Sequence, residues 1–181
     1  SHLIWTYERL FGVFRQKVAQ ILLTHEDLRS RTRYLNARNT LLTLLQYSVI
    51  PIINENDTVS VEEIRFGDND TLSAMVCNLV DADVLILLTH LDGLYTADPD
   101  LHPEATLMPV VEKIDARIES MASSATHRTG RGGMASKIRA AKIAVANGIH
   151  TYIANGLHPE VVLRVLAGDR VGTHIYPSAP I

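Results

Sequence analysis

A glycine-rich segment that ends in a lysine is the part of this sequence best suited to chemistry. It reads Thr129-Gly130-Arg131-Gly132-Gly133-Met134-Ala135-Ser136-Lys137 and leads into apolar residues at helical spacing. Glycines let backbone N–H groups approach an anion, a helix start adds unpaired donors, and the lysine adds a full positive charge. The segment therefore predicts a phosphate-binding loop, with a flexible surface connection as the alternative.

Two clusters of acidic and amide residues lie beside predicted regular structure. The first, Asn54-Glu55-Asn56-Asp57, follows the apolar run 49–53, which is typical of a buried parallel strand. It thus lies at a carboxyl strand end, where open α/β sheets bind ligands. The second, Gly67-Asp68-Asn69-Asp70, precedes a helical stripe, and Asn69 or Asp70 is the expected N-cap. Both clusters predict parts of a binding site.

The elements that must position these residues alternate between helices and strands. Apolar residues at helical spacing predict helices over 10–21, 34–45, 72–80, 138–147 and 159–167, the last two ended by Gly148 and Gly168. Apolar runs predict strands at 49–53, 84–88, 149–154 and 171–176, with a small β-excursion over 58–66 and a loop over 120–134. This alternation predicts an α/β fold, a three-layer αβα sandwich around a mostly parallel sheet.

Composition narrows the function classes. A chain of 181 residues with 46% hydrophobic residues is sufficient for one domain, and a net charge of -3 without a long basic run argues against nucleic-acid binding. The apolar runs are too short for a membrane span and no signal segment is present, which predicts a cytoplasmic protein. The single cysteine, Cys77, is expected in the core, and the eight histidines lack zinc-site spacing, so no transition metal is predicted and no side chain is assigned as a metal ligand.

The glycine segment matches neither of the common nucleotide fingerprints. It is not G-x-x-x-x-G-K-[ST], and it lacks G-x-G-x-x-G after a strand, which argues against a Walker ATPase and a Rossmann dehydrogenase. What remains is a lysine, carboxylates able to hold magnesium or orient lysines, and amide-rich loops for a small polar substrate. Phosphoryl transfer requires little more, because it depends on alignment and charge neutralisation.

With these residues in view, the chain resembles the amino acid kinase family, and within it the branch that phosphorylates glutamate. The resemblance extends in family order over nearly the whole chain, and the Asn54–Asp57 cluster separates this branch from the aspartate, acetylglutamate and nucleotide kinases. The residues that carry it are Leu35-Asn36-Ala37-Arg38, Ile53-Asn54-Glu55-Asn56-Asp57, Phe66-Gly67-Asp68-Asn69-Asp70, Asp92-Gly93-Leu94-Tyr95-Thr96-Ala97-Asp98-Pro99 and Gly132-Gly133-Met134-Ala135-Ser136-Lys137.

The resemblance implies ATP-dependent phosphorylation of the γ-carboxylate of L-glutamate with Mg²⁺, the first step of proline biosynthesis. Asp57, Asn69 and Asn54 would bind glutamate. Lys137 would stabilise charge on the transferring phosphoryl group, and Asp70 would orient lysine ammonium groups. The implied nucleotide-binding residues are Thr89, His90, Arg131, Gly132, Gly133, Met134, Ala135, Ser136 and Lys137.

The resemblance also implies the extent and partners of the protein. The family begins with a strand bearing a lysine and a glycine-serine loop, so residues 1–181 are expected to be a kinase domain truncated at its N-terminus, without the RNA-modification-like C-terminal domain of some members. A homo-oligomer with proline as a feedback inhibitor is expected. The family commonly has an aspartate where this chain has His90.

Several alternatives stay open at this point. The alternative for Lys137 is a solvated lysine at a helix start, and the alternative for Asp70 is a simple N-cap. Because a lysine at a helix start contributes little to stability, Lys137→Ala is expected to lower turnover far more than stability. The alternative functions are a non-catalytic nucleotide- or amino-acid-binding fragment and a sibling kinase for another carboxylate or phosphate acceptor.

Overall fold

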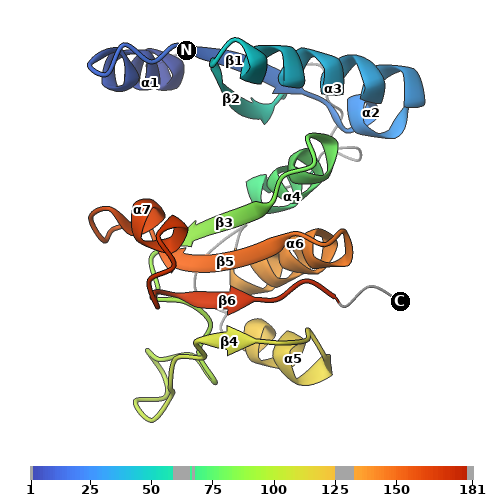
Figure 1. Cartoon of the computed structure of the whole chain (residues 1–181). Helices are drawn as coiled ribbons and strands as arrows, with labels where there is room; N and C mark the ends of the chain where they lie inside the picture. Colours follow the sequence, from blue (N-terminus) through green and yellow to red (C-terminus); the bar gives the residue numbers. More distant parts are fainter. Residues whose placement is uncertain (1, 59–65, 67, 125–132, 179–181) are drawn as a thin grey trace. The chain divides into compact units, whose positions relative to one another are not determined.

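The computed structural model describes residues 2–58, 66, 68–124 and 133–178. The chain forms two compact units, residues 1–69 and 70–181 (Figure 1). No helix among the described residues is long and apolar enough to cross a lipid bilayer.

The first unit contains two parallel strands joined through helices. Its elements are α1 (His2–Gly12), β1 (Val18–Leu23), α2 (His25–Arg29), α3 (Arg31–Gln46) and β2 (Ile50–Glu55). Strand β1 pairs in parallel with β2, from Val18 opposite Ile50 to Leu23 opposite Glu55, and α3 packs against β2. The helix predicted over 34–45 and the strand predicted over 49–53 are confirmed.

The helix predicted over 10–21 is wrong beyond Gly12, and only positions 10–12 of it are helical. Helix α1 ends at Gly12, and Val18 and Ile21 belong to strand β1. The chain reverses at Arg15, whose φ of 54° is left-handed, and the Gln16 N–H donates to the Phe11 carbonyl at 3.1 Å. Spacing alone missed this end because the left-handed position holds an arginine, while the nearby glycine, Gly12, is the last residue of the helix.

The second unit is built on a four-stranded sheet. Its helices are α4 (Asn69–Leu79), which starts at the last residue of the first unit, α5 (Ala116–Ser124), α6 (Met134–Ala146) and α7 (Val161–Leu166). Its strands are β3 (Val84–Thr89), β4 (Val110–Val111), β5 (His150–Asn155) and β6 (Thr173–Ile175), ordered β3-β5-β6-β4 (Figure 1). The pairs β3–β5 and β4–β6 are parallel and β5–β6 is antiparallel.

Helices cover both faces of this sheet. Leu87 of β3 and Ile153 of β5 belong to a core that also contains residues of α4, α5 and α6. On the opposite face, Ala154 of β5 packs with Val161 and Val165 of α7. Because successive strand residues point to opposite faces, one strand serves both cores. The predicted three-layer arrangement with a mostly parallel sheet is therefore confirmed in this unit.

Every helix of the described part that leads directly into a strand ends in the same way. A left-handed residue follows the helix, and the next N–H donates to a carbonyl five residues back, which is the Schellman pattern. Gly148 (φ 78°) and Gly168 (φ 84°) do this as predicted. The other ends use residues that carry no glycine signal: Arg15, Ser48 and Asp81.

Two further expectations change in detail. Helix α4 already includes Asn69 and Asp70, so both lie in its first turn and neither is the N-cap. The loop predicted over 120–134 is helical at both ends, since α5 extends to Ser124 and α6 begins at Met134; residues 125–132 lie outside the described part. Most of the β-excursion predicted over 58–66 also lies outside it.

Candidate functional site

The described end of the glycine segment is the start of helix α6. Gly133 is the N-cap, with φ −67° and ψ −177°, and it offers no side chain to cap the first turn. Met134, Ser136 and Lys137 are buried, while Ala135 is partly exposed. A helix start without a capping side chain keeps N–H donors for another acceptor, which is the property that a phosphate site requires. Arg131 and Gly132 lie outside the described residues.

Lys137 is paired with Asp70 across the interior of the second unit. The Lys137 ammonium nitrogen lies 3.2 Å from Oδ2 and 3.4 Å from Oδ1 of Asp70. The two side chains are only 9% and 16% exposed. The solvated-lysine alternative for Lys137 is therefore wrong, and Asp70 is more than a residue of the helix start. This contact is the one that the resemblance implied, an aspartate that orients a lysine.

Ser136 also bonds to the Asp70 carboxylate, a contact that the sequence did not indicate. Its hydroxyl donates to Asp70 Oδ2 at 2.5 Å and lies 3.1 Å from the Gly133 carbonyl oxygen. Ser136 is 4% exposed. The sequence suggested Ser136 only as part of a nucleotide-binding segment, because the pairing joins positions 66 residues apart.

The surroundings of the Lys137–Asp70 pair favour an anion. Asp70 lies in the first turn of α4, and Lys137 lies in the first turn of α6, so two positive helix ends meet one carboxylate and one ammonium group. The carboxylate balances the ammonium, and the start of α6, which has no capping side chain, adds N–H donors that favour an anion. A phosphate group is a ligand that such donors attract.

Thr89 and His90 lie at the carboxyl edge of the same sheet. Thr89 is the last residue of β3, is paired with Asn155 of β5, and accepts a hydrogen bond from the Gly156 N–H at 2.9 Å. His90 follows and is exposed. Because α6 leads through a short turn into β5, it runs antiparallel to that strand and begins toward this edge. Open α/β sheets bind ligands at this edge.

Asp92 extends the polar edge beyond the predicted residues. The Asn155 amide donates to Asp92 Oδ1 at 3.1 Å, and His158 Nε2 lies 3.6 Å from the same oxygen. Both side chains of the Asp92–His158 pair are about half exposed, so the contact contributes little to stability.

The rest of the Asp92–Pro99 motif has a structural explanation. The Leu94 N–H donates to Thr173 Oγ1 at 2.9 Å, and a Cβ on Gly93 would lie 2.5 Å from that oxygen. Asp98 is 8% exposed, and its carboxylate accepts from the Asp100 N–H at 2.9 Å. These residues hold the loop after β3 against β6, and they explain why glycine and aspartate are needed there.

The predicted glutamate-binding residues are found in the first unit. Asn54 is the second-last residue of β2, and its Oδ1 accepts from the Glu55 N–H at 2.9 Å. Asp57 is exposed just after the strand. Asn69 is exposed at the start of α4. The Glu55 carboxylate accepts from the Phe66 N–H at 3.0 Å and so ties the first polar cluster to the start of the second. Sequence reasoning did not predict this role for Glu55.

Cys77 has no part in this arrangement. Cys77 packs against the core, and burial raises the pKa of its thiol to about 11, so the reactive thiolate is scarce at neutral pH. The described residues contain no group of three or more His, Cys, Asp or Glu side chains placed to hold a metal ion.

Comparison with known proteins agrees with this geometry. The profile of the amino acid kinase family matches residues 1–155. The chain is 54% identical over 177 residues to the protein named glutamate 5-kinase of Desulfotalea psychrophila, covering 98% of this chain and 47% of that protein. It is 55% identical over 177 residues to the glutamate 5-kinase of Azoarcus sp., covering 98% and 48%. The chain thus spans about half the length of the curated relatives it matches.

Solved structures with low sequence identity share the fold. The isopentenyl phosphate kinase of T. acidophilum in its product complex has a TM-score of 0.67 at 18% identity, over 96% of this chain and 66% of that one. The UMP kinase of Bacillus anthracis has a TM-score of 0.61 at 17% identity, over 98% and 67%. These structures share the fold alone, whereas the family profile covers more than half of the chain: the chain belongs to the amino acid kinase family.

Proposed function

We propose that this chain takes part in the ATP-dependent phosphorylation of the γ-carboxylate of L-glutamate, which yields glutamyl 5-phosphate and ADP and opens proline biosynthesis. The identity of 54% with proteins named glutamate 5-kinase over 98% of the chain supports the choice of acceptor. The observation that carries the proposal is the buried Lys137–Asp70 pair at the start of α6, where the glycine segment ends.

The chemistry needs no dedicated general base. An ionised carboxylate is already a nucleophile, so a γ-carboxylate oxygen attacks the γ-phosphorus of ATP while the bond from that phosphorus to the β–γ bridging oxygen breaks. The electron pair of that bond leaves with ADP. Negative charge on the moving phosphoryl group is stabilised by the Lys137 ammonium, which Asp70 holds at 3.2 Å.

The remaining residues are assigned to binding. Asp57, Asn69 and Asn54 would bind glutamate through its charged and polar groups. The nucleotide would be bound by Thr89, His90 and the segment from Arg131 through Gly132, Gly133, Met134, Ala135 and Ser136 to Lys137. His90 is exposed directly after the carboxyl end of β3, which supports its assignment to the nucleotide.

Mg²⁺ would be bound mainly by the nucleotide. The described residues offer no cluster of three ligand side chains, and magnesium in kinases is commonly held by phosphate oxygens with one or two carboxylates. When bound, the ion supplies charge neutralisation on the phosphates.

The decisive experiment is an acceptor panel. ADP release from ATP and Mg²⁺ would be measured with L-glutamate, L-aspartate, N-acetylglutamate and UMP in parallel, for the 181-residue chain and for the protein expressed from its whole gene. We expect turnover with glutamate alone. Turnover with another acceptor in place of glutamate would identify a sibling kinase. Nucleotide binding without turnover by the whole gene product would identify a binding protein.

Regulation and assembly form a second part of the proposal. We propose a cytoplasmic homo-oligomer that proline inhibits by acting near the glutamate-binding residues 54–57. Proline should then raise the KM for glutamate without lowering kcat at saturating glutamate. Sedimentation of the purified protein would give the oligomer size, and a monomer at assay concentration would remove that part of the proposal.

A further inference from the structure

The hydroxyl group of Ser136 is turned toward Asp70, not toward solvent. It lies 2.5 Å from Asp70 Oδ2, the same oxygen that lies 3.2 Å from the Lys137 ammonium. We propose that Ser136 is a positioning residue that acts through Asp70: it fixes the rotation of the carboxylate and thereby sets where the Lys137 ammonium points. This inference rests on the proposed kinase function, since it concerns the same lysine.

The contact has the geometry of a charge-assisted hydrogen bond. A hydroxyl has one hydrogen, and its two candidate acceptors are Asp70 Oδ2 at 2.5 Å and the Gly133 carbonyl at 3.1 Å. The shorter bond to the charged oxygen is the stronger one. The Gly133 contact is the weaker local bond that serines make with the preceding turn of a helix. Ser136 therefore donates to Asp70.

A carboxylate held only by a lysine can rotate about its side-chain bonds, and the hydrogen bond from Ser136 removes this rotational freedom. Lys137 bridges both oxygens of Asp70, at 3.2 and 3.4 Å, and an ammonium on a flexible stem follows the carboxylate when it rotates. Ser136 is short, lies on the rigid first turn of α6, and is 4% exposed, so it holds Oδ2 in place. Because the hydroxyl is neutral, it fixes the carboxylate without adding charge.

Direct binding of nucleotide through the Ser136 hydroxyl makes a different prediction. A nucleotide ligand would lose affinity when the hydroxyl is removed, and KM for ATP would rise. A positioning residue leaves the affinity and lowers the rate, because a carboxylate released by the serine draws the ammonium toward itself and away from the transferring phosphoryl group. The split between KM and kcat separates the two roles.

The variants needed are Ser136→Ala, which removes the hydroxyl, and Ser136→Thr, which retains it. Ser73→Ala is a matched control, because the Ser73 hydroxyl donates to the main-chain carbonyl of Asp70 at 2.6 Å and leaves the carboxylate alone. In the whole gene product we expect Ser136→Ala to lower kcat roughly 5- to 50-fold with KM for ATP and glutamate changed less than about threefold. Ser136→Thr should restore most of kcat, and Ser73→Ala should match the parent protein.

A double-mutant cycle tests whether Ser136 acts through Asp70. In an Asp70→Asn background, Ser136→Ala should cause little further loss of kcat, because the group it positions is already altered. Equal losses in both backgrounds, an unchanged kcat for Ser136→Ala, or a loss confined to KM for ATP would each overturn the proposal.

The same cycle measured by urea unfolding separates this inference from the proposed function. Coupling between positions 136 and 70 in the free energy of unfolding reports the hydrogen bond even in a protein without glutamate-dependent turnover. Absence of turnover in the parent protein would reject the proposed function. Turnover in the parent without coupling between the two positions would reject the role of Ser136 alone.

Discussion

The Lys137 ammonium lies 3.2 Å from the Asp70 carboxylate, although the two residues are 67 positions apart in the chain. Each comes from the first turn of a different helix of the second unit, α6 and α4. The pair is largely buried, with side chains 9% and 16% exposed. Lys137, for which the sequence left a solvated position open, is thus part of the interior, and its removal has consequences for both rate and stability.

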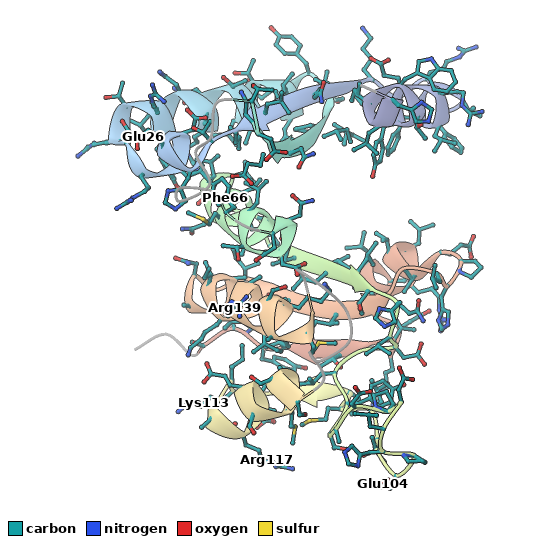
Figure 2. The ribbon with its side chains drawn as sticks, turned by 180° about the vertical axis from the view of Figure 1, so that it is seen from behind. Glu26, Phe66, Glu104, Lys113, Arg117 and Arg139 are labelled. Atoms are coloured by element: carbon teal, nitrogen blue, oxygen red, sulfur yellow. The ribbon has the colours of Figure 1, made fainter. Side chains whose placement is uncertain are left out.

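Replacing Lys137 with alanine should reduce stability as well as turnover. The expectation of a nearly unchanged fold assumed an exposed lysine, and the structure shows a buried one. Removing it leaves the Asp70 carboxylate without its cation, which costs about 1–3 kcal/mol of unfolding free energy for a pair that keeps some solvent contact. Urea unfolding of Lys137→Ala checks this. Arg139→Ala is the control, because Arg139 on the same helix is exposed (Figure 2). The urea midpoint of the Arg139→Ala variant should equal that of the parent protein.

Thr173 should be one of the least replaceable polar residues in the second unit. It is fully buried, its Oγ1 accepts from the Leu94 N–H at 2.9 Å, and it donates to the Met108 carbonyl at 2.6 Å. Thr173→Val keeps the shape but leaves both main-chain groups without this partner, at a cost of about 1–3 kcal/mol.

Thr151 gives a control of the same residue type and burial. Within the described part of the chain its hydroxyl oxygen is buried without a hydrogen-bond partner. Thr151→Val should therefore leave the thermal midpoint unchanged or raise it. A loss of stability for Thr151→Val as large as that for Thr173→Val would contradict the explanation by hydrogen bonding.

The left-handed residues that end the helices predict stabilising substitutions. Arg15 (φ 54°) and Ser48 (φ 56°) carry side chains in a conformation that favours glycine. Arg15→Gly and Ser48→Gly should each raise the free energy of unfolding by a few tenths to about 1 kcal/mol, after the greater freedom of glycine in the unfolded chain is counted.

Gly148→Ala tests the opposite change, from glycine to a residue with a side chain. The added Cβ would meet nothing within 4 Å, so only the left-handed φ of 78° disfavours the alanine. This variant should lose about 1 kcal/mol.

Histidine 174 should make the fold sensitive to mild acid. Its ring stacks between Tyr152 and Tyr176 at 4.1 and 4.2 Å, and its Nε2 lies 2.9 Å from His150 Nδ1. Burial, and then the neighbouring charge of His150, lower its pKa below the ordinary 6.5. The folded state therefore favours the neutral ring, so this contribution to stability is present above pH 6.5 and is lost as the pH falls through the folded pKa.

The measurement is the urea midpoint from pH 7.5 down to pH 5, for the parent protein and His174→Phe. Phenylalanine retains the ring stack without a titrating group, so the midpoint should depend less on pH in the variant. An identical pH dependence for both proteins would contradict the assignment of this titration to His174.

Much of the fold follows from local signals along the chain. The strands over 84–88 and 149–154 and the helix after Lys137 were predicted because apolar runs and helical spacing are properties of neighbouring residues. Glycine at positions 148 and 168 marks helix ends for the same reason, since it adopts left-handed backbone at low cost. Where Arg15 takes that role, the signal is absent, and the sequence-based helix extended into strand β1.

The features of the candidate site also divide into those that the sequence indicated and those that tertiary contacts decided. Residue types and order alone indicated a phosphate-binding segment ending in Lys137, acidic and amide clusters around Asn54 and Asn69, and a resemblance to one family, because these depend on side-chain chemistry and chain order. Only the tertiary structure decided that Lys137 is buried, that it is the lysine in contact with Asp70, that Ser136 bonds to that carboxylate, and that β6 runs antiparallel to β5. Each of these depends on contacts between residues distant in the chain, where burial and the pairing of polar groups are set by packing and not by local preference.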